Sequence, residues 1–214
     1  MTRLNRSRPT KPPSPTLLPT STSKPLAVAI TGAIGAGKSA ALDSFARHGA
    51  ATISSDEIVH RLLRSDPKVQ RELVERFGPE VMGPDGADRA KIAEIVFSDP
   101  DHLDWLEELL HPRVVEENLA WRREVERRPE RPALTVSEVP LLYETGADRR
   151  FDVVVVITAP ERLRRERRPQ ADDREQRLLP DEEKVRRADY AYVNDGTLEE
   201  LDAFVAGVVA ELTA

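Results

Sequence analysis

Gly32-Ala33-Ile34-Gly35-Ala36-Gly37-Lys38-Ser39 is the stretch that decides the fold of this chain. It has the form G-x-x-x-x-G-K-S, a glycine-rich loop whose backbone N–H groups surround the phosphates of a nucleotide. Residues 26–31 before it are apolar and typical of a buried parallel strand, and residues 39–48 after it predict an amphipathic helix. A strand, a tight turn and a helix N-terminus in this order predict a nucleoside triphosphate site.

Contacts to the nucleotide are expected along this whole phosphate loop. Lys38 is predicted to reach the β- and γ-phosphates, and the Ser39 hydroxyl is predicted to ligate Mg²⁺. The residues expected to bind the nucleotide here are Gly32, Gly35, Ala36, Gly37, Lys38, Ser39 and Ala40. The loop leaves open which group receives the phosphate.

Length and composition restrict the class of protein. The 214 residues suit one domain with an inserted subdomain, and the absence of cysteine excludes disulfides and thiol chemistry. No apolar run approaches the roughly 18 residues of a membrane span. After the first 24 residues the chain carries 27 basic and 38 acidic groups, a balance that argues against a nucleic-acid-binding surface. We therefore expect a cytoplasmic protein that binds neither membranes nor nucleic acid.

The first 24 residues differ from the rest. They hold five basic groups, no acidic group and many Ser, Thr and Pro residues, and they lack the apolar core of a signal peptide. We predict a disordered basic tail over residues 1–24. Contact with RNA and a weak targeting role are the alternatives to a solvated extension.

A helical insertion is predicted between the strands. Residues 50–53 form a second short strand, and four or five helical segments follow over about 57–130 without a strand. Within them, His111-Pro112 is expected to end one helix at Leu110 and to start another. His111 is a candidate ligand contact or simply a residue at that helix end.

Three later strands complete the predicted sheet. Residues 133–139, 151–158 and 191–193 are apolar runs, and a capping box, Thr197-x-x-Glu200, opens the last helix. Strands that alternate with helices around a phosphate loop predict a doubly wound α/β fold with a five-stranded parallel sheet.

Two carboxylates follow predicted strands at the sheet edge that lines the ligand crevice. Asp56 is a candidate base for the acceptor hydroxyl, with a helix N-cap as the alternative. Glu138 is a candidate for the Mg²⁺ shell. After it, Pro140 fixes the backbone at the strand exit, and Leu141 with its two successors forms an apolar wall or packs in the core.

An arginine-rich segment over about 161–184 predicts a lid that closes on the phosphates. A solvated helical face with compensating acidic residues is the alternative. The lid candidates are Arg164, Arg165, Arg168 and Arg174.

Taken in order, these motifs resemble the dephospho-CoA kinase family from about residue 26 to 201. Besides the phosphate loop, the resemblance includes Asp56 with its two preceding serines, the stretches 77–78, 85–86, 96–100 and 110–112, Pro140 to Glu144, Lys184-x-x-x-Ala188-Asp189-Tyr190, and Asn194-Asp195-Gly196. The resemblance implies a P-loop kinase fold over 25–214, a helical CoA-binding subdomain and a short lid. It implies transfer of phosphate from ATP, with Mg²⁺, to the ribose 3′-hydroxyl of dephospho-CoA.

The resemblance also assigns residues. It makes Asp56 the catalytic base beside Lys38, and it places Asn194 and Gly196 near the adenine of ATP. The substrate contacts it suggests are Asp56, His111, Pro140, Leu141 and Glu144.

The chain departs from the family pattern at several positions. Ser54 stands where the family has a carboxylate, Ala33, Ala36 and Ala40 replace more usual residues, and the lid is shorter, with Leu178 in place of a glutamine. We therefore weigh three hypotheses: a dephospho-CoA kinase, a nucleoside monophosphate kinase, and a nucleotide-binding regulatory protein that has lost activity. We expect a monomer or a small homo-oligomer.

Overall fold

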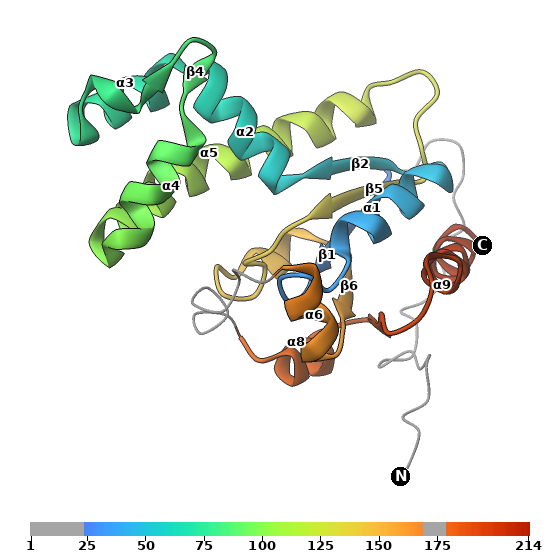
Figure 1. The fold of residues 1–214 in the computed structure, drawn as a ribbon. Helices are drawn as coiled ribbons and strands as arrows, with labels where there is room; N and C mark the ends of the chain where they lie inside the picture. Colours follow the sequence, from blue (N-terminus) through green and yellow to red (C-terminus); the bar gives the residue numbers. More distant parts are fainter. Residues whose placement is uncertain (1–23, 169–178) are drawn as a thin grey trace. The chain divides into compact units, whose positions relative to one another are not determined.

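The computed structural model describes residues 24–168 and 179–214 (Figure 1). The chain divides into two compact units. The sheet unit comprises the chain up to Ser54 together with Glu124–Ala214, and the helical unit is Ser55–Arg123. The predicted tail lies outside the described residues except for Lys24, whose ammonium pairs with Glu126 at 3.0 Å. None of the described helices has the length and apolar character that crossing a membrane requires.

The sheet unit is built on five parallel strands in the order β2-β5-β1-β6-β7. This confirms the predicted sheet, and it places β1, which leads into the phosphate loop, at the centre. A central strand is covered on both faces, so it reads as a continuous apolar run. The strands are β1 Leu26–Thr31, β2 Ala51–Ser54, β5 Leu134–Glu138, β6 Val153–Thr158 and β7 Tyr190–Val193.

Helices cover one face of the sheet. α1 Lys38–Arg47 and α9 Leu198–Thr213 lie side by side (Figure 1) and contact each other. Phe45 and Val205, both fully buried, join them to Val28 and Ile30 of β1 in one hydrophobic cluster. Because side chains alternate along a strand, Ala29 belongs to the other face, in a second cluster with Leu142, Tyr143 and Ala188.

Short elements complete the sheet unit around the predicted lid. α6 Glu161–Arg167 follows β6, and α8 Asp181–Arg187 precedes β7. Residues 169–178 between them, which include Arg174 and Leu178, lie outside the described residues. A 3-10 helix, η2 Ala147–Arg150, joins β5 to β6.

The helical unit contains helices and one small hairpin. Asp66 and Asp88 cap two of the helices, because each side chain accepts hydrogen bonds from two backbone N–H groups of the first turn. Residues 84–85 join the two short antiparallel strands of the hairpin. The elements are α2 Ser55–Ser65, α3 Pro67–Phe77, η1 Pro79–Val81, β3 Met82–Gly83, β4 Gly86–Ala87, α4 Arg89–Ser98 and α5 Pro100–Glu126.

The expected helix break at His111-Pro112 is wrong. α5 runs through both residues as one helix of 27 residues. A proline inside a helix costs about 3 kcal/mol, because it lacks the N–H donor and its ring crowds the preceding turn. The Arg113 guanidinium donates a hydrogen bond of 2.6 Å to the Leu109 carbonyl, next in the chain to Glu108, whose carbonyl the proline leaves without its usual donor. Burial of Leu110 further offsets this cost.

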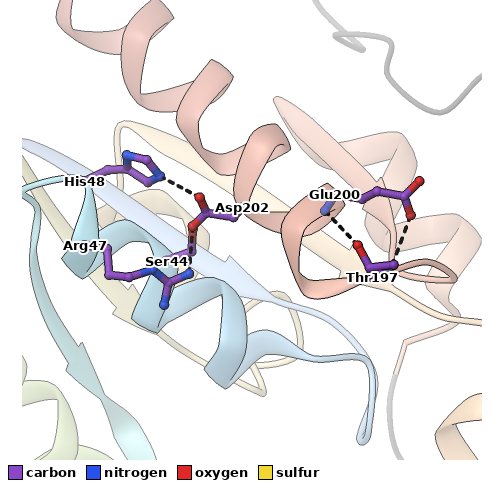
Figure 2. Close-up of polar contacts among 6 residues, drawn as sticks. All are labelled: Ser44, Arg47, His48, Thr197, Glu200 and Asp202. Carbon is purple, nitrogen blue, oxygen red and sulfur yellow. Dashed lines mark hydrogen bonds and ion pairs between the residues drawn. The ribbon is translucent and has the colours of Figure 1, made fainter.

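Asp202 ties α9 to α1 in the sheet unit (Figure 2). Its Oδ1 accepts from Ser44 Oγ at 2.5 Å and from Arg47 Nη2 at 2.7 Å, and its Oδ2 lies 3.3 Å from His48 Nε2. The hydrogen bonds from Ser44 and Arg47 lower the pKa of Asp202 from the ordinary 3.8 to about 2. Figure 2 also shows the predicted capping box, which is confirmed: Thr197 and Glu200 bond each other's backbone N–H groups.

Loss of the Asp202 charge is expected to destabilise the sheet unit. Because the folded pKa is lowered, the stabilisation is present above about pH 4 and is lost as the pH falls towards 2. Asp202→Asn should therefore lower the midpoint of urea unfolding at pH 7, and the difference from wild type should shrink as the pH falls below 4. Asp43→Asn, at an exposed position of α1, is the matched control. A difference that does not change with pH would contradict this account.

Candidate active site

The phosphate loop is shaped by glycines at close contacts. Gly37 has a φ of 100°, and a side chain there would place its Cβ 2.2 Å from Asn194 Nδ2. Gly35 has a φ of 76°, and its Cβ would lie 2.8 Å from the Arg164 carbonyl oxygen of α6. Neither position accepts a side chain without strain, because both the backbone conformation and the neighbouring atoms exclude one. The loop is thus packed between α6 and the residue that follows β7.

Lys38 and Ser39 stand at the start of α1, as predicted. Lys38 is largely buried, and its Nζ donates to the Ala33 carbonyl at 2.9 Å. The side chain therefore lies across the loop, from the start of α1 back to residue 33. Ser39 Oγ donates to Glu138 Oε2 at 3.4 Å. The N-terminus of α1 and the Lys38 ammonium together make this a site for an anion.

The sheet order brings Glu138 to Ser39. Glu138 is the last residue of β5 and lies opposite Ile30 of β1 on one side and Ser54 of β2 on the other. It is 4% exposed. A hydroxyl and a carboxylate suit Mg²⁺, which keeps several waters and binds few protein oxygens when phosphates share the ion. Within residues 24–168 and 179–214, no group of three or more His, Asp or Glu side chains is arranged so that it could hold a metal ion by itself.

Asn194 supports the phosphate loop directly. Its Nδ2 donates to the Ala36 carbonyl at 2.8 Å, and its backbone N–H donates to the Thr158 carbonyl at 2.7 Å. The residue is 4% exposed. This buried amide holds the loop carbonyl in place, a structural contact that the sequence did not indicate. Its predicted position near adenine stays a prediction.

A side chain is excluded at Gly196 by the capping box of α9. A Cβ there would lie 1.6 Å from Glu200 Oε2, the carboxylate oxygen that closes the capping box on Thr197. The missing side chain therefore lets Glu200 reach back to the start of α9. Contact between Gly196 and a nucleotide remains a prediction.

The arginines of α6 have different neighbours. Arg164 Nε donates to the Ala159 carbonyl at 3.1 Å, on the face against which Gly35 packs. Arg165 is 63% exposed and forms an ion pair of 2.5 Å with Glu161, one turn earlier in α6. Arg168 ends the helix and is exposed. Of the predicted lid arginines within the described residues, which are Arg164, Arg165 and Arg168, Arg164 is the one that lies against the phosphate loop.

Arg167 belongs to the predicted arginine-rich segment but was not among the arginines singled out as lid candidates. Its Nη1 donates to the Gly35 carbonyl at 3.2 Å, and its Nη2 donates to the Asn194 carbonyl at 3.5 Å. It bridges the loop and the end of β7 from α6. The three-residue spacing between Arg164 and Arg167 could have indicated this contact, because it places both side chains on one face of a helix.

Glu144 anchors the segment that returns from the lid. Its Oε1 accepts from the Leu179 backbone N–H at 2.8 Å and lies 3.0 Å from Lys184 Nζ. Lys184 is completely buried. A buried ammonium is costly unless a counter-charge neutralises it, so this pair fixes α8 against the segment after β5. The predicted substrate contact of Glu144 stays untested, and the role of Lys184 was missed.

The other residues of the segment after β5 differ in how deeply they are buried. The Pro140 carbonyl accepts from Thr31 Oγ1 at 3.2 Å, and Leu141 is half-buried. Leu142 and Tyr143 are buried in the second core cluster, so they pack in the core rather than form an apolar wall of the site.

Asp181, at the first turn of α8, is a further acidic neighbour of this cationic region. Burial raises the pKa of Asp181 above its ordinary value of 3.8, and the charges of Arg164, Lys184 and Lys38 act in the opposite direction. The Asp181 carboxylate is therefore close enough to Arg164, Lys184 and Lys38 to feel their charges.

Two predicted site residues belong to the helical unit. Asp56 is the second residue of α2 and is exposed. It lies inside the first turn of α2 rather than at the N-cap position before it. In the first turn, a carboxylate interacts favourably with the helix dipole. His111 is exposed in the middle of α5, not at a helix end.

Asn194→Ala should destabilise the sheet unit and weaken nucleotide binding. The substitution leaves the Ala36 carbonyl without its buried donor, which costs about 1–3 kcal/mol. We expect that loss in the free energy of unfolding and a raised KM for ATP. Asp195→Ala, at the exposed neighbour, is the control and should change neither. Unchanged unfolding of Asn194→Ala would show that the amide does not support the loop.

Comparison with known proteins identifies the family. A family model described as dephospho-CoA kinase matches residues 26–200. The dephospho-CoA kinase of Chlorobaculum tepidum is 38% identical over 201 residues, which cover 88% of this chain and 95% of that protein. The dephospho-CoA kinase of Chlamydia abortus is 40% identical over 187 residues, which cover 82% and 91%.

Solved structures agree. TT1252 from Thermus thermophilus superposes with a TM-score of 0.69 at 32% identity, covering 90% of this chain and 100% of that one. The dephospho-CoA kinase from Campylobacter jejuni has a TM-score of 0.62 at 24% identity, covering 89% and 98%, and so shares the fold. By its phosphate loop, its sheet and these relatives, the chain is a kinase that belongs to the dephospho-CoA kinase family.

Proposed function

We propose that this enzyme transfers the γ-phosphoryl group of ATP to the ribose 3′-hydroxyl of dephospho-CoA, giving coenzyme A and ADP. The observation that carries the proposal is the phosphate loop with Lys38 across it and Ser39 on Glu138, in a chain whose relatives are named dephospho-CoA kinases. Both substrates are small molecules, and the proposal requires no nucleic acid or membrane. We place the enzyme in the cytoplasm, as a monomer or a small homo-oligomer.

The phosphate loop would bind ATP through its backbone N–H groups and the N-terminus of α1. Lys38 would reach the β- and γ-phosphate oxygens with its ammonium group. Ser39 and Glu138 would hold Mg²⁺, which neutralises charge on the transferring group when bound. Arg164 and Arg167 lie against the loop and would add positive charge as the lid closes.

Asp56 would orient the acceptor and take its proton. The 3′-oxygen forms a bond to the γ-phosphorus, the bond from that phosphorus to the β–γ bridging oxygen breaks, and the hydroxyl proton passes to the Asp56 carboxylate. ADP leaves with the electron pair of the broken bond. Asp56 is exposed in the first turn of α2.

The choice of acceptor is tested by ADP release. In a coupled assay with ATP and Mg²⁺, we expect rapid turnover with dephospho-CoA and none above background with a panel of nucleoside monophosphates. Turnover of a monophosphate alone would replace the proposal with a nucleoside monophosphate kinase. ATP binding without turnover of any acceptor would indicate a regulatory binding protein.

Asp56→Asn tests the base. The amide keeps the shape of the side chain but cannot accept the proton, so kcat with dephospho-CoA should fall by ~10²–10⁴. The affinity for ATP, measured by calorimetry, should stay within twofold and serves as the control for folding. An unchanged kcat would remove Asp56 from the mechanism.

A further inference from the structure

Asp181, an acidic residue of α8, has no part in the proposed transfer of phosphate. A carboxylate close to a phosphate site is unexpected, because its charge repels the ligand that the cations of the site attract. Asp181 is half-buried in the first turn of α8, whereas its neighbour Glu182 is exposed. A half-buried charge loses part of its hydration, so the groups around it must compensate for that loss.

The position of α8 is fixed by the side of the helix that faces the core. Lys184 is completely buried, and its Nζ lies 3.0 Å from Glu144 Oε1. The same oxygen accepts from the Leu179 backbone N–H just before the helix. Leu179 and Val185 both pack against the second core cluster. Charge pairing and apolar packing therefore hold α8 in place on both sides of Lys184.

Asp181 lies on the same face of α8 as Lys184. The two residues are three positions apart, and this spacing places their side chains next to each other on one side of a helix. Because Lys184 is directed into the core, towards Glu144, Asp181 lies on the inward side of the first turn. This placement explains why Asp181 is half-buried while Glu182, one position further along, is exposed.

Two cations of the phosphate site lie within electrostatic reach of the Asp181 carboxylate. The charges of Arg164 and Lys38 both act on it. Arg164 is held by the hydrogen bond of 3.1 Å from its Nε to the Ala159 carbonyl. Lys38 is held by the hydrogen bond of 2.9 Å from its Nζ to the Ala33 carbonyl. The carboxylate therefore offsets positive charge that stands at a fixed place around the phosphate loop.

The other acidic residues in the first turn of α8 have different surroundings. Glu183 forms an ion pair with Arg186 within the helix. Glu182 is exposed, so water and salt screen its charge from the site. Asp181 thus differs from its two neighbours by facing the phosphate site, and Glu182 provides a matched control on the same turn.

We propose that Asp181 is the counter-charge of the phosphate site, which offsets Lys38 and Arg164 when no nucleotide is bound and weakens the binding of nucleotide phosphates. The inference rests on the proposed function, in which the phosphate loop binds ATP. Each turnover leaves ADP on that loop, and ADP must dissociate before the next ATP binds. A fixed negative charge near the loop destabilises bound ADP and so favours its release.

Removal of the charge tests the inference. Asp181→Asn and Asp181→Ala should each bind ADP ~10-fold more tightly than wild type in calorimetry at pH 8, with and without Mg²⁺, because a repulsive charge is gone. Asp181→Glu keeps the charge and should recover the wild-type affinity. The matched control, Glu182→Gln, removes the same charge from an exposed position and should stay within twofold of wild type. Thermal unfolding checks that every variant folds.

Tighter binding is a result that a merely structural role of Asp181 does not produce, because a disturbed fold weakens binding. If both neutral variants bind ADP within twofold of wild type, the counter-charge is wrong. Weaker ADP binding that appears only with Mg²⁺ would also overturn it, because Asp181 would then be a metal ligand. Tightening by Asp181→Asn without tightening by Asp181→Ala would overturn it as well, since a new amide donor would explain the change.

The measurements separate this inference from the proposed function. If wild type phosphorylates dephospho-CoA while the neutral variants bind ADP as wild type does, the activity stands and the counter-charge fails. If wild type binds ADP but turns over no dephospho-CoA, the proposed function fails, and the ADP affinities of the variants still decide the role of Asp181. If wild type does not bind ADP at all, both fail together.

Discussion

Hydrogen bonds to the carbonyl groups of the phosphate loop are the interactions on which the site depends. The carbonyls of Ala33, Gly35 and Ala36 accept from Lys38, Arg167 and Asn194 in turn. A peptide unit is planar, so a carbonyl that is held in one direction turns the N–H of the same unit the opposite way. These side chains therefore set the directions of the N–H groups that would contact phosphate. The two buried donors, Lys38 and Asn194, also remove the cost of leaving the Ala33 and Ala36 carbonyls unpaired.

The sheet order explains how distant parts of the chain reach this loop. β1 lies between β5 and β6, so the residues that end those strands lie on either side of the loop. Glu138 arrives from β5, and α6 with Arg167 follows β6. Asn194 follows β7 at the sheet edge and bonds back to Thr158 at the end of β6. The parallel arrangement places all of these strand ends at one edge, where ligands bind in open α/β sheets.

The sequence predicted those parts of the fold that local patterns determine. The phosphate loop, the parallel strands and the capping box at Thr197 each carry a pattern within a few residues, and each was found where expected. The break at Pro112 was wrong, because the contacts of α5 outweigh the local preference of proline. The contacts of Arg167 and Lys184 were not predicted, because their partners, Gly35 and Glu144, lie far away in the sequence. Which of the neighbouring arginines contacts the phosphate loop depends on such long-range contacts, and local patterns do not show it.

Ser54 is the departure from the family pattern that bears most directly on the metal. It is buried at the end of β2 and lies opposite Glu138 across the β2–β5 pair. Neighbouring strands are about 4.8 Å apart, so a carboxylate at position 54 would put a second negative charge beside Glu138 in a buried place. With serine there, the carboxylate of this strand pair is that of Glu138, which already contacts Ser39. The negative charge that the proposed Mg²⁺ site requires is therefore retained in the absence of a carboxylate at position 54.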